Sequence, residues 1–191
     1  MENIITFIIP SINRTTIVNS IESLKNQTNP NWKCIIVYDG VDGTQFDDER
    51  ITTIKTEKKG IEGVNNLVAG IGVCGLVRNE GIKLCNTEWI GLLDDDDTIH
   101  PNYVEKLFEK YTKHDLVVWR MKYVNGFILP EFDRTDLVFG RVGISFCYKN
   151  KFDDLLFDND LDGDDFGFLS KLTKLTDNWI ITDEVYYNVR H

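Results

Sequence analysis

Two stretches of the sequence concentrate acidic side chains. Four aspartates follow one another from Asp94 to Asp97, and seven more lie between Asp153 and Asp165, with no lysine or arginine in either stretch. Carboxylates at contact distance disfavour each other's ionised form, so a cation is expected to neutralise the run of four. A hard divalent ion with oxygen ligands, Mg²⁺ or Mn²⁺, suits this role and commonly also binds substrate phosphates. The first stretch therefore indicates a metal site for a ligand that contains a diphosphate.

The elements that position these acids alternate between buried strands and amphipathic helices. Continuous apolar runs at 4–9, 34–37 and 89–93 predict buried strands, and 51–56 predicts a shorter one. Apolar residues at helical spacing predict helices over 15–27 and 76–85. This alternation predicts an α/β fold with a Rossmann-like, mixed and mostly parallel sheet flanked by helices.

Three of the predicted strands end in polar residues that could bind a ligand. The first ends at Pro10-Ser11, the second at Asp39, and the strand over 89–93 at Asp94. An isolated acidic run is more often a solvated turn. Ligands of open α/β sheets, however, bind beyond the carboxyl ends of the strands, so these residues are expected to converge on one crevice.

Beyond Pro101 the sequence predicts the rest of a single domain. A helix is expected after Pro101, and another is expected around Phe168 to Leu175. Strands are expected over 115–121, 127–129, 144–148, 179–181 and 185–189. The length of 191 residues, without a repeat or a linker, argues for one domain over 1–191.

Composition narrows the classes of partner. The formal net charge of −10 repels nucleic-acid phosphates and anionic lipid surfaces, so we expect no nucleic-acid partner. No stretch approaches the roughly 20 apolar residues of a transmembrane segment. The four cysteines show no CxxC spacing, and no secretory leader is recognisable, so we expect reduced, buried thiols and a cytoplasmic location.

Several motifs together resemble those of family 2 glycosyltransferases of the GT-A fold. They are IIPSINRTT, IIVYDGVDGT, GLVRNEG with the following WIGLLDDDD, GDDFGFLSKL and YYNVRH, and they occur in the family's order along essentially the whole chain. The resemblance implies a nucleotide-binding half over 1–100 and an acceptor-side half over 101–191. It implies a metal-dependent, inverting, hexosyltransferase-like enzyme that moves a sugar from a nucleotide diphosphate donor, a UDP-sugar, to a hydroxyl group of a glycan, glycoprotein or glycolipid.

The resemblance also implies roles for individual residues. Asp39 matches an acid that hydrogen-bonds the base. The family's common Asp-Asp pair is Tyr38-Asp39 in this sequence, and Tyr38 is expected to supply the surface that a family tyrosine offers beside the base. Arg78 matches an arginine near the phosphates or ribose; the other interpretation is a surface cation on a helix. The nucleotide-binding set is Pro10, Ser11, Asn13, Arg14, Tyr38, Asp39, Arg78, Asp94 and Asp95.

The same resemblance suggests a metal set and a catalytic base. LLDDDD resembles the family's LDxDD signature, which nominates Asp96 and Asp97 as metal ligands, together with His191 at the end of the chain. Gly-Asp-Asp at 163–165 resembles the motif that opens the acceptor-side helix, so Asp165 is the candidate base, with Asp164 in reserve. A helix N-terminus favours an ionised carboxylate, which a base requires.

Two other functions fit parts of the sequence. Gly70, Gly72 and Gly75 form a literal G-x-G-x-x-G with a predicted helix after it, which would suit an NAD-dependent oxidoreductase. That hypothesis leaves most of the carboxylates and Gly163 to Asp165 without a role. A catalytically silent module that binds nucleotide sugars is the second alternative.

Overall fold

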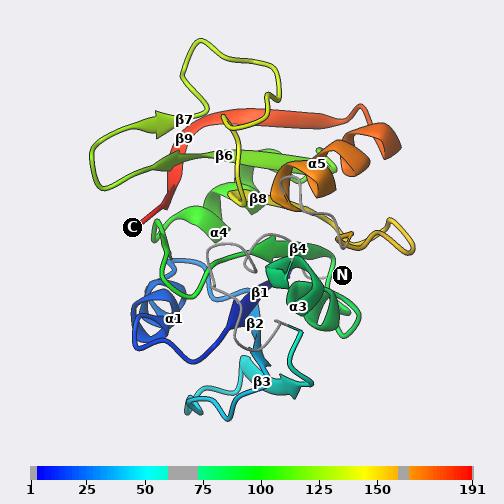
Figure 1. Ribbon diagram of the computed structural model, residues 1–191. Helices are drawn as coiled ribbons and strands as arrows, with labels where there is room; N and C mark the ends of the chain where they lie inside the picture. Colours follow the sequence, from blue (N-terminus) through cyan, green and yellow to red (C-terminus); the bar gives the residue numbers. More distant parts are fainter. Residues whose placement is uncertain (1–3, 60–72, 159–163, 191) are drawn as a thin grey trace.

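The computed structural model describes residues 4–59, 73–158 and 164–190 (Figure 1). The described strands form one sheet in the order β3-β2-β1-β4-β8-β6-β9-β5, with β7 paired to β6. They are β1 (Ile5–Ser11), β2 (Trp32–Asp39), β3 (Ile51–Thr56), β4 (Trp89–Leu92), β5 (Thr98–Ile99), β6 (Leu116–Lys122), β7 (Ile128–Leu129), β8 (Phe146–Lys149) and β9 (Trp179–Asn188). The helices are α1 (Ile17–Lys25), α3 (Val73–Ile82), α4 (Tyr103–Lys106) with a π-helical continuation over Leu107–Tyr111, and α5 (Asp164–Leu175).

The first half of the chain forms the parallel part of the sheet. β1 pairs in parallel with both β2 and β4, and every residue of β1 is buried, as expected for a central strand covered on both faces. α1 buries Ile17, Ile21 and Leu24 at helical spacing. Figure 1 shows α1 and α3 on opposite sides of β1 and β2.

A glycine lets α3 approach this part of the sheet closely. Gly81 faces β1, and a Cβ atom at that position would lie 2.6 Å from Cγ2 of Ile8, well inside contact distance. Any larger residue would push α3 away from β1. The close approach matters because α3 carries Arg78 and Asn79, both of which are buried.

The second half of the chain extends the same sheet. β8 lies antiparallel between β4 and β6, and β9 runs parallel to β6. β6 and β9 therefore run in the same direction as β1 to β4, and the mixed, mostly parallel α/β sheet predicted from the sequence is confirmed.

The chain end differs from the prediction. Two strands were predicted over 179–181 and 185–189, but β9 is one strand from Trp179 to Asn188. Two register irregularities opposite β6 let the polar residues at 182–184 stay within the strand instead of forming a turn. The short strand β5 was not predicted, since two residues carry no recognisable period; it pairs with the end of β9.

No helix among the described residues is long and apolar enough to cross a bilayer. Cys34 and Cys147 are buried, as expected, whereas Cys85 is only partly buried and Cys74 is exposed, so the expectation of burial was wrong for Cys74.

Candidate active site

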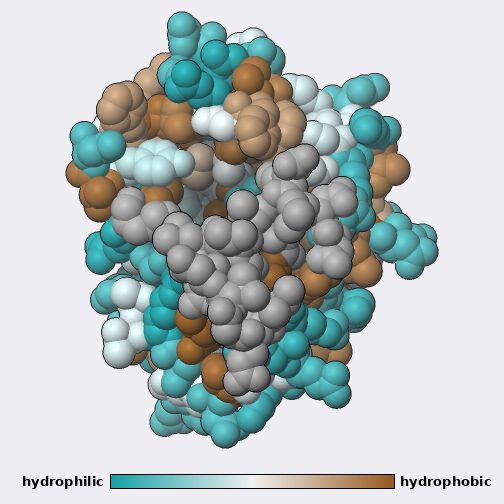
Figure 2. Space-filling model, in the orientation of Figure 1, coloured by the Kyte–Doolittle hydropathy of each residue, from teal (hydrophilic) through white to brown (hydrophobic). Residues whose placement is uncertain are grey.

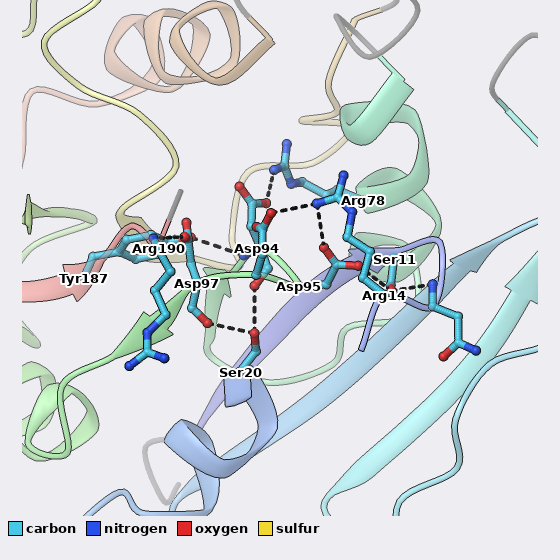
Figure 3. Close-up of polar contacts among 11 residues, drawn as sticks. Ser11, Arg14, Ser20, Arg78, Asp94, Asp95, Asp97, Tyr187 and Arg190 are labelled. Carbon is cyan, nitrogen blue, oxygen red and sulfur yellow. Dashed lines mark hydrogen bonds and ion pairs between the residues drawn. The ribbon is translucent and has the colours of Figure 1, made fainter. Parts of the chain in front are cut away.

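The carboxyl ends of β1 and β4 meet at one edge of the sheet. Ser11 ends β1, and Asp94 to Asp97 follow β4 almost directly. Ser11 Oγ donates to Oδ2 of Asp95 at 2.6 Å, which joins the two strand ends (Figure 3). The predicted convergence of polar residues at this edge is therefore confirmed for these two strands.

The loop between β1 and α1 is held in a defined shape by Asn13. Its backbone has φ 64°, a left-handed conformation that asparagine tolerates better than most residues, and its N–H donates to Ser11 Oγ at 2.9 Å. Its side-chain oxygen accepts hydrogen bonds from the N–H and hydroxyl of Thr44, at 3.1 and 3.0 Å. Asn13 thus ties this loop to the loop that follows β2.

Arg14, the next residue, reaches two of the four aspartates. Its Nη1 lies 3.3 Å from Oδ1 of Asp95 and 2.7 Å from Oδ2 of Asp96. About half of the Arg14 side chain is exposed, so its ion pairs are open to solvent and a ligand can compete for them. An anionic ligand at this edge would meet the Arg14 guanidinium.

Arg78 connects the strand edge to α5. Its side chain is only 3% exposed, which excludes the interpretation as a surface cation. Nη2 lies 2.5 Å from Oδ1 of Asp94, and Nη1 lies 3.2 Å from Oδ1 of Asp165 (Figure 3 shows the first of these contacts). One buried guanidinium therefore joins a carboxylate of the predicted nucleotide site to the predicted catalytic base.

The end of β9 supplies contacts that the sequence did not predict. The buried Tyr187 accepts a hydrogen bond from the Asp94 N–H at 3.2 Å, and its hydroxyl also contacts the Asp97 carboxylate. The N–H of Arg190 donates to Oδ1 of Asp97 at 2.9 Å. Tyr187 lies in the YYNVRH motif, between Val185 and Val189, and this strand alternation was the signal that could have placed its side chain inward.

Ser20 of α1 is a second residue that was missed. Its buried hydroxyl donates to the carbonyl of Asp97 at 2.7 Å and lies 3.2 Å from that of Asp94, so it closes the turn that carries the aspartates. A serine inside an amphipathic helix offers no signal of this contact in the sequence, because the partner is more than 70 residues away.

Two of the four aspartates have perturbed acidity. Burial raises the pKa of Asp97 to about 6, and the charges of Asp94 and Asp96 act in the same direction against its hydrogen bonds. Burial also raises the pKa of Asp95, against the opposing effects of Ser11 and Arg14. Burial therefore disfavours the ionised form of two of these four carboxylates, and carboxylates with raised pKa values are common at functional sites.

The predicted base-binding residues lie at the end of β2. Asp39 is buried, and its Oδ1 accepts a hydrogen bond from the Lys59 N–H at 2.6 Å. Tyr38 is 1% exposed, packs against Gly43 and donates its hydroxyl to the Thr44 carbonyl at 2.8 Å. Tyr38 therefore supports the loop after β2, and the expectation that its ring offers a surface to a base is not met in this structure. Pro10 is likewise buried within β1.

The predicted catalytic residues open α5. Asp165 is about one-third exposed and contacts Arg78, whereas the side chain of Asp164 lies outside the described residues. The next residue, Phe166, meets the ring of Phe139 edge to face, with centroids 5.6 Å apart. Phe139 is 66% exposed, and Figure 2 shows apolar surface in the upper part of this face of the molecule.

The chemistry of the aspartates suits a metal shared with a substrate. Within residues 4–59, 73–158 and 164–190, no three His, Cys, Asp or Glu side chains form a complete metal site. Mg²⁺ is commonly held by only one or two carboxylates together with substrate phosphates, and the partly exposed Asp94 and Asp96 fit that arrangement. Asp97 is engaged by Tyr187 and Arg190, so its role as a ligand stays a prediction, and His191 lies outside the described residues.

Comparisons with known proteins agree with this architecture. A family model described as glycosyl transferase family 2 matches residues 6–164. EpsH of Bacillus subtilis (strain 168) is 35% identical over 101 residues, which cover 49% of this chain and 26% of EpsH. Glycosyltransferase GlyG of Streptococcus pneumoniae is 25% identical over 160 residues, or 78% of this chain and 47% of GlyG. The chain thus matches about half or less of the length of these curated relatives.

Solved structures share the fold. A crystal structure of S. aureus TarS gives a TM-score of 0.74 at 19% identity, and the match covers 98% of this chain and 37% of the TarS chain. A TarS 1–349 structure in complex with UDP-GlcNAc gives a TM-score of 0.73 at 18% identity, covering 98% of this chain and 58% of that one. At this level of identity the likeness shows the fold, which is GT-A-like as the sequence motifs implied.

Proposed function

Since the chain belongs to glycosyl transferase family 2, we propose that it moves a sugar from a UDP-sugar to an acceptor hydroxyl group, with inversion at the anomeric carbon. The observation that carries the proposal is the Arg78 bridge, because one buried cation connects the donor-side Asp94 to the acceptor-side Asp165. Such a connection is expected where a departing diphosphate and an attacking hydroxyl must be positioned together.

The donor is proposed to lie along the edge formed by β1, β2 and β4. Asp39 is the last residue of β2, where the base is proposed to lie, and its bond to the Lys59 N–H uses Oδ1. Arg14 and Arg78 supply the positive charge that a diphosphate needs, although both are paired with aspartates in this structure. The choice of UDP draws on the TarS fragment of similar fold, which has been crystallised with UDP-GlcNAc and with UDP.

A divalent cation, Mn²⁺ or Mg²⁺, is proposed to accompany the donor. Asp96, with Asp94 beside it, would hold the ion, because these two carboxylates are partly exposed and offer only oxygen ligands. When bound, the ion would offset the charge that grows on the departing diphosphate.

Asp165 is proposed to act as the general base. Its carboxylate would take the proton of the acceptor hydroxyl while that oxygen attacks the anomeric carbon and the bond from this carbon to the diphosphate oxygen breaks. Arg78 Nη1 lies 3.2 Å from Oδ1 of Asp165 and so holds this carboxylate in place at the start of α5. Attack from the side opposite the leaving group accounts for inversion.

The acceptor is proposed to be a glycan, glycoprotein or glycolipid. Phe139, which contacts the neighbour of Asp165 and exposes two-thirds of its surface, offers an aromatic face on which a sugar ring can pack. Arg141, two residues along the chain, is paired with Glu131, and so is Arg134, so the arginines near Phe139 in the sequence are offset by a carboxylate. This setting favours a saccharide over an anionic polymer.

Ligand-dependent stabilisation tests the donor. A ligand that binds only the native state stabilises it by roughly 2.7 kcal/mol at a hundredfold excess over its Kd. UDP with Mn²⁺ should therefore raise the melting temperature, and EDTA should reduce the rise. A rise with NAD(H) and none with UDP would refute the proposal.

Metal-dependent hydrolysis of nucleotide sugars tests the reaction itself. Slow release of UDP from one member of a panel of UDP-sugars would identify the donor without knowledge of the acceptor. Binding of UDP-sugars with no hydrolysis or transfer would favour the catalytically silent module.

The oxidoreductase alternative gains no support from the sheet order. Gly70 and Gly72 lie outside the described residues, and Gly75 is buried within α3. The last described strand before this loop is β3, which lies at the edge of the sheet. In dinucleotide-binding folds the glycine-rich loop follows a central strand.

A further inference from the structure

We propose that Asn79 of α3 is a positioning residue for Asp165, so that α3 sets the separation between the donor-side Asp94 and the candidate base. The inference rests on the proposed function, because it assigns Asp165 its role as base. It concerns the residue next to Arg78, to which neither the sequence motifs nor the comparisons give a role.

The first step is a reciprocal hydrogen-bonded pair. Asn79 Nδ2 donates to the carbonyl of Phe157 at 2.9 Å, and the N–H of Phe157 donates to Asn79 Oδ1 at 2.8 Å. Both hydrogen bonds are buried, and Asn79 is 6% exposed. A side-chain amide is the group that satisfies the donor and the acceptor of one backbone residue together. Asn79 therefore fixes the backbone of the segment before α5 against α3.

The second step runs from Phe157 into α5. The buried ring of Phe157 stacks on that of Phe168, with centroids 4.1 Å apart and an interplanar angle of 19°. Phe168 lies three residues after Asp165, which places the two residues on neighbouring positions, one turn apart, at the start of α5. The position of the Phe157 backbone therefore sets where the first turn of α5 can pack.

Arg78 contacts both Phe157 and Asp165. Its guanidinium carbon lies 5.5 Å from the Phe157 ring centroid, and Nη1 contacts Asp165. Of two consecutive residues of α3, Asn79 thus holds the backbone of Phe157, whose ring packs on α5, and Arg78 contacts α5 directly through the Asp165 carboxylate. Because Arg78 also binds Asp94, displacement of α5 would change the geometry of the two carboxylates relative to each other.

The test compares Asn79→Ala with two matched variants. Asn150→Ala removes a similar side-chain amide, which donates to the carbonyls of Cys85 and Thr87 but does not reach α5. Ser145→Ala removes a buried hydroxyl that donates to the Trp119 carbonyl at 2.7 Å. These variants control for the loss of an amide and for the cost of a buried hydrogen bond.

Hydrogen exchange is the first readout because it needs no ligand. Asn79→Ala leaves buried backbone groups of Phe157 unpaired, so amides of the first turns of α5 should exchange at least about tenfold faster. Asn150→Ala and Ser145→Ala should leave these amides as in wild type. Unchanged exchange in α5 of Asn79→Ala would overturn the proposal, and this holds even if UDP binding, and with it the proposed function, fails.

The second readout separates positioning from general damage. With UDP-GlcNAc as the probe, the hydrolysis rate at saturation should fall about 10- to 100-fold in Asn79→Ala, because small misplacements of a reacting group have effects of this size. The affinity for UDP should stay near that of wild type. Asn79→Asp, which keeps the acceptor for the Phe157 N–H, should recover part of the rate. A fall in UDP affinity equal to the loss of rate, or an equal loss of rate in the two controls, would overturn the proposal.

Discussion

Two arginines of this chain hold carboxylates in contrasting ways. Arg50 donates two side-chain hydrogen bonds, of 2.9 and 2.7 Å, to the carboxylate of Asp48. Its guanidinium carbon lies 3.8 Å from the centroid of the Trp32 ring. This pairing lowers the pKa of Asp48 to about 2, through the Arg50 side-chain hydrogen bonds above all. Arg78 instead divides its contacts between Asp94 and Asp165, beside aspartates whose pKa is raised by burial.

The difference lies in how each cluster is assembled. Asp48 and Arg50 are two residues apart, so a local turn brings one cation to one carboxylate and the charges balance. The residues around Arg78 come from separate elements, and the two arginines Arg14 and Arg78 contact four carboxylates at this site. An imbalance of this kind costs stability, and proteins accept such costs chiefly at sites that bind or react.

The largest expected effect is on the reaction rate, which should fall on replacement of Asp165 but not on replacement of Asp48. Asp165→Asn should lower the rate of sugar transfer or donor hydrolysis by about 10²- to 10⁴-fold, because the proton acceptor is lost. UDP binding, measured by calorimetry, should persist. Asp48→Asn is the control and should keep the wild-type rate. Near-normal turnover by Asp165→Asn would show that Asp165 is not the base.

Replacement of Arg78 should lower the free energy of unfolding more than replacement of Arg50. Arg78→Gln leaves Asp94 and Asp165 without their shared buried cation, so the free energy of unfolding should fall by about 2 kcal/mol, after allowance for the partial exposure of both carboxylates. Arg50→Gln should lower it by about 1 kcal/mol or less. Urea denaturation of both variants measures the difference, and equal losses would remove the contrast between the clusters.

Removal of the metal tests whether Asp96 differs from a carboxylate outside the site in its effect on UDP binding. Asp96→Asn should weaken UDP binding about tenfold or more in the presence of Mn²⁺, and much less with EDTA, because Asp96 is the proposed ligand. Asp42→Asn, which alters an exposed carboxylate paired with Lys55, is a control. An unchanged response to Mn²⁺ in Asp96→Asn would remove this residue from the ligand set.

The smallest effect is a pH dependence of the Asp48–Arg50 pair. The pKa of Asp48 is about 2 in the native protein and about 3.8 in the unfolded chain, so its contribution to stability is present above about pH 4 and is lost as the pH falls toward 2. Solvent screening limits this contribution to about 1 kcal/mol or less. In urea titrations, wild type and Asp48→Asn should differ at neutral pH and converge near pH 2. If the difference in unfolding free energy between the two proteins stayed constant down to pH 2, the Asp48–Arg50 pair would not be the cause of the pH dependence.

Much of the fold and part of the site could be predicted from the sequence. The apolar runs at 4–9, 34–37 and 89–93 became β1, β2 and β4, since a strand buried on both faces must be apolar throughout. The same parallel order places Ser11, Asp39 and Asp94 at the strand ends. The motifs also implied family 2, which the family model over residues 6–164 confirms, whereas the roles that they suggested for the carboxylates of α5 and of the strand ends stay predictions.

Contacts between distant segments were beyond such reasoning. Three contacts of this kind join residues that are 16 to 93 positions apart in the chain. They are the ion pair of the buried Arg78 with Asp94, the hydrogen bonds of Asn79 with Phe157, and the contact of the Tyr187 hydroxyl with Asp94. The local pattern of apolar and polar residues determines which segments become strands and helices. Only tertiary packing decides which polar side chains face each other, because that depends on how closely α3, α5 and β9 approach the end of β4.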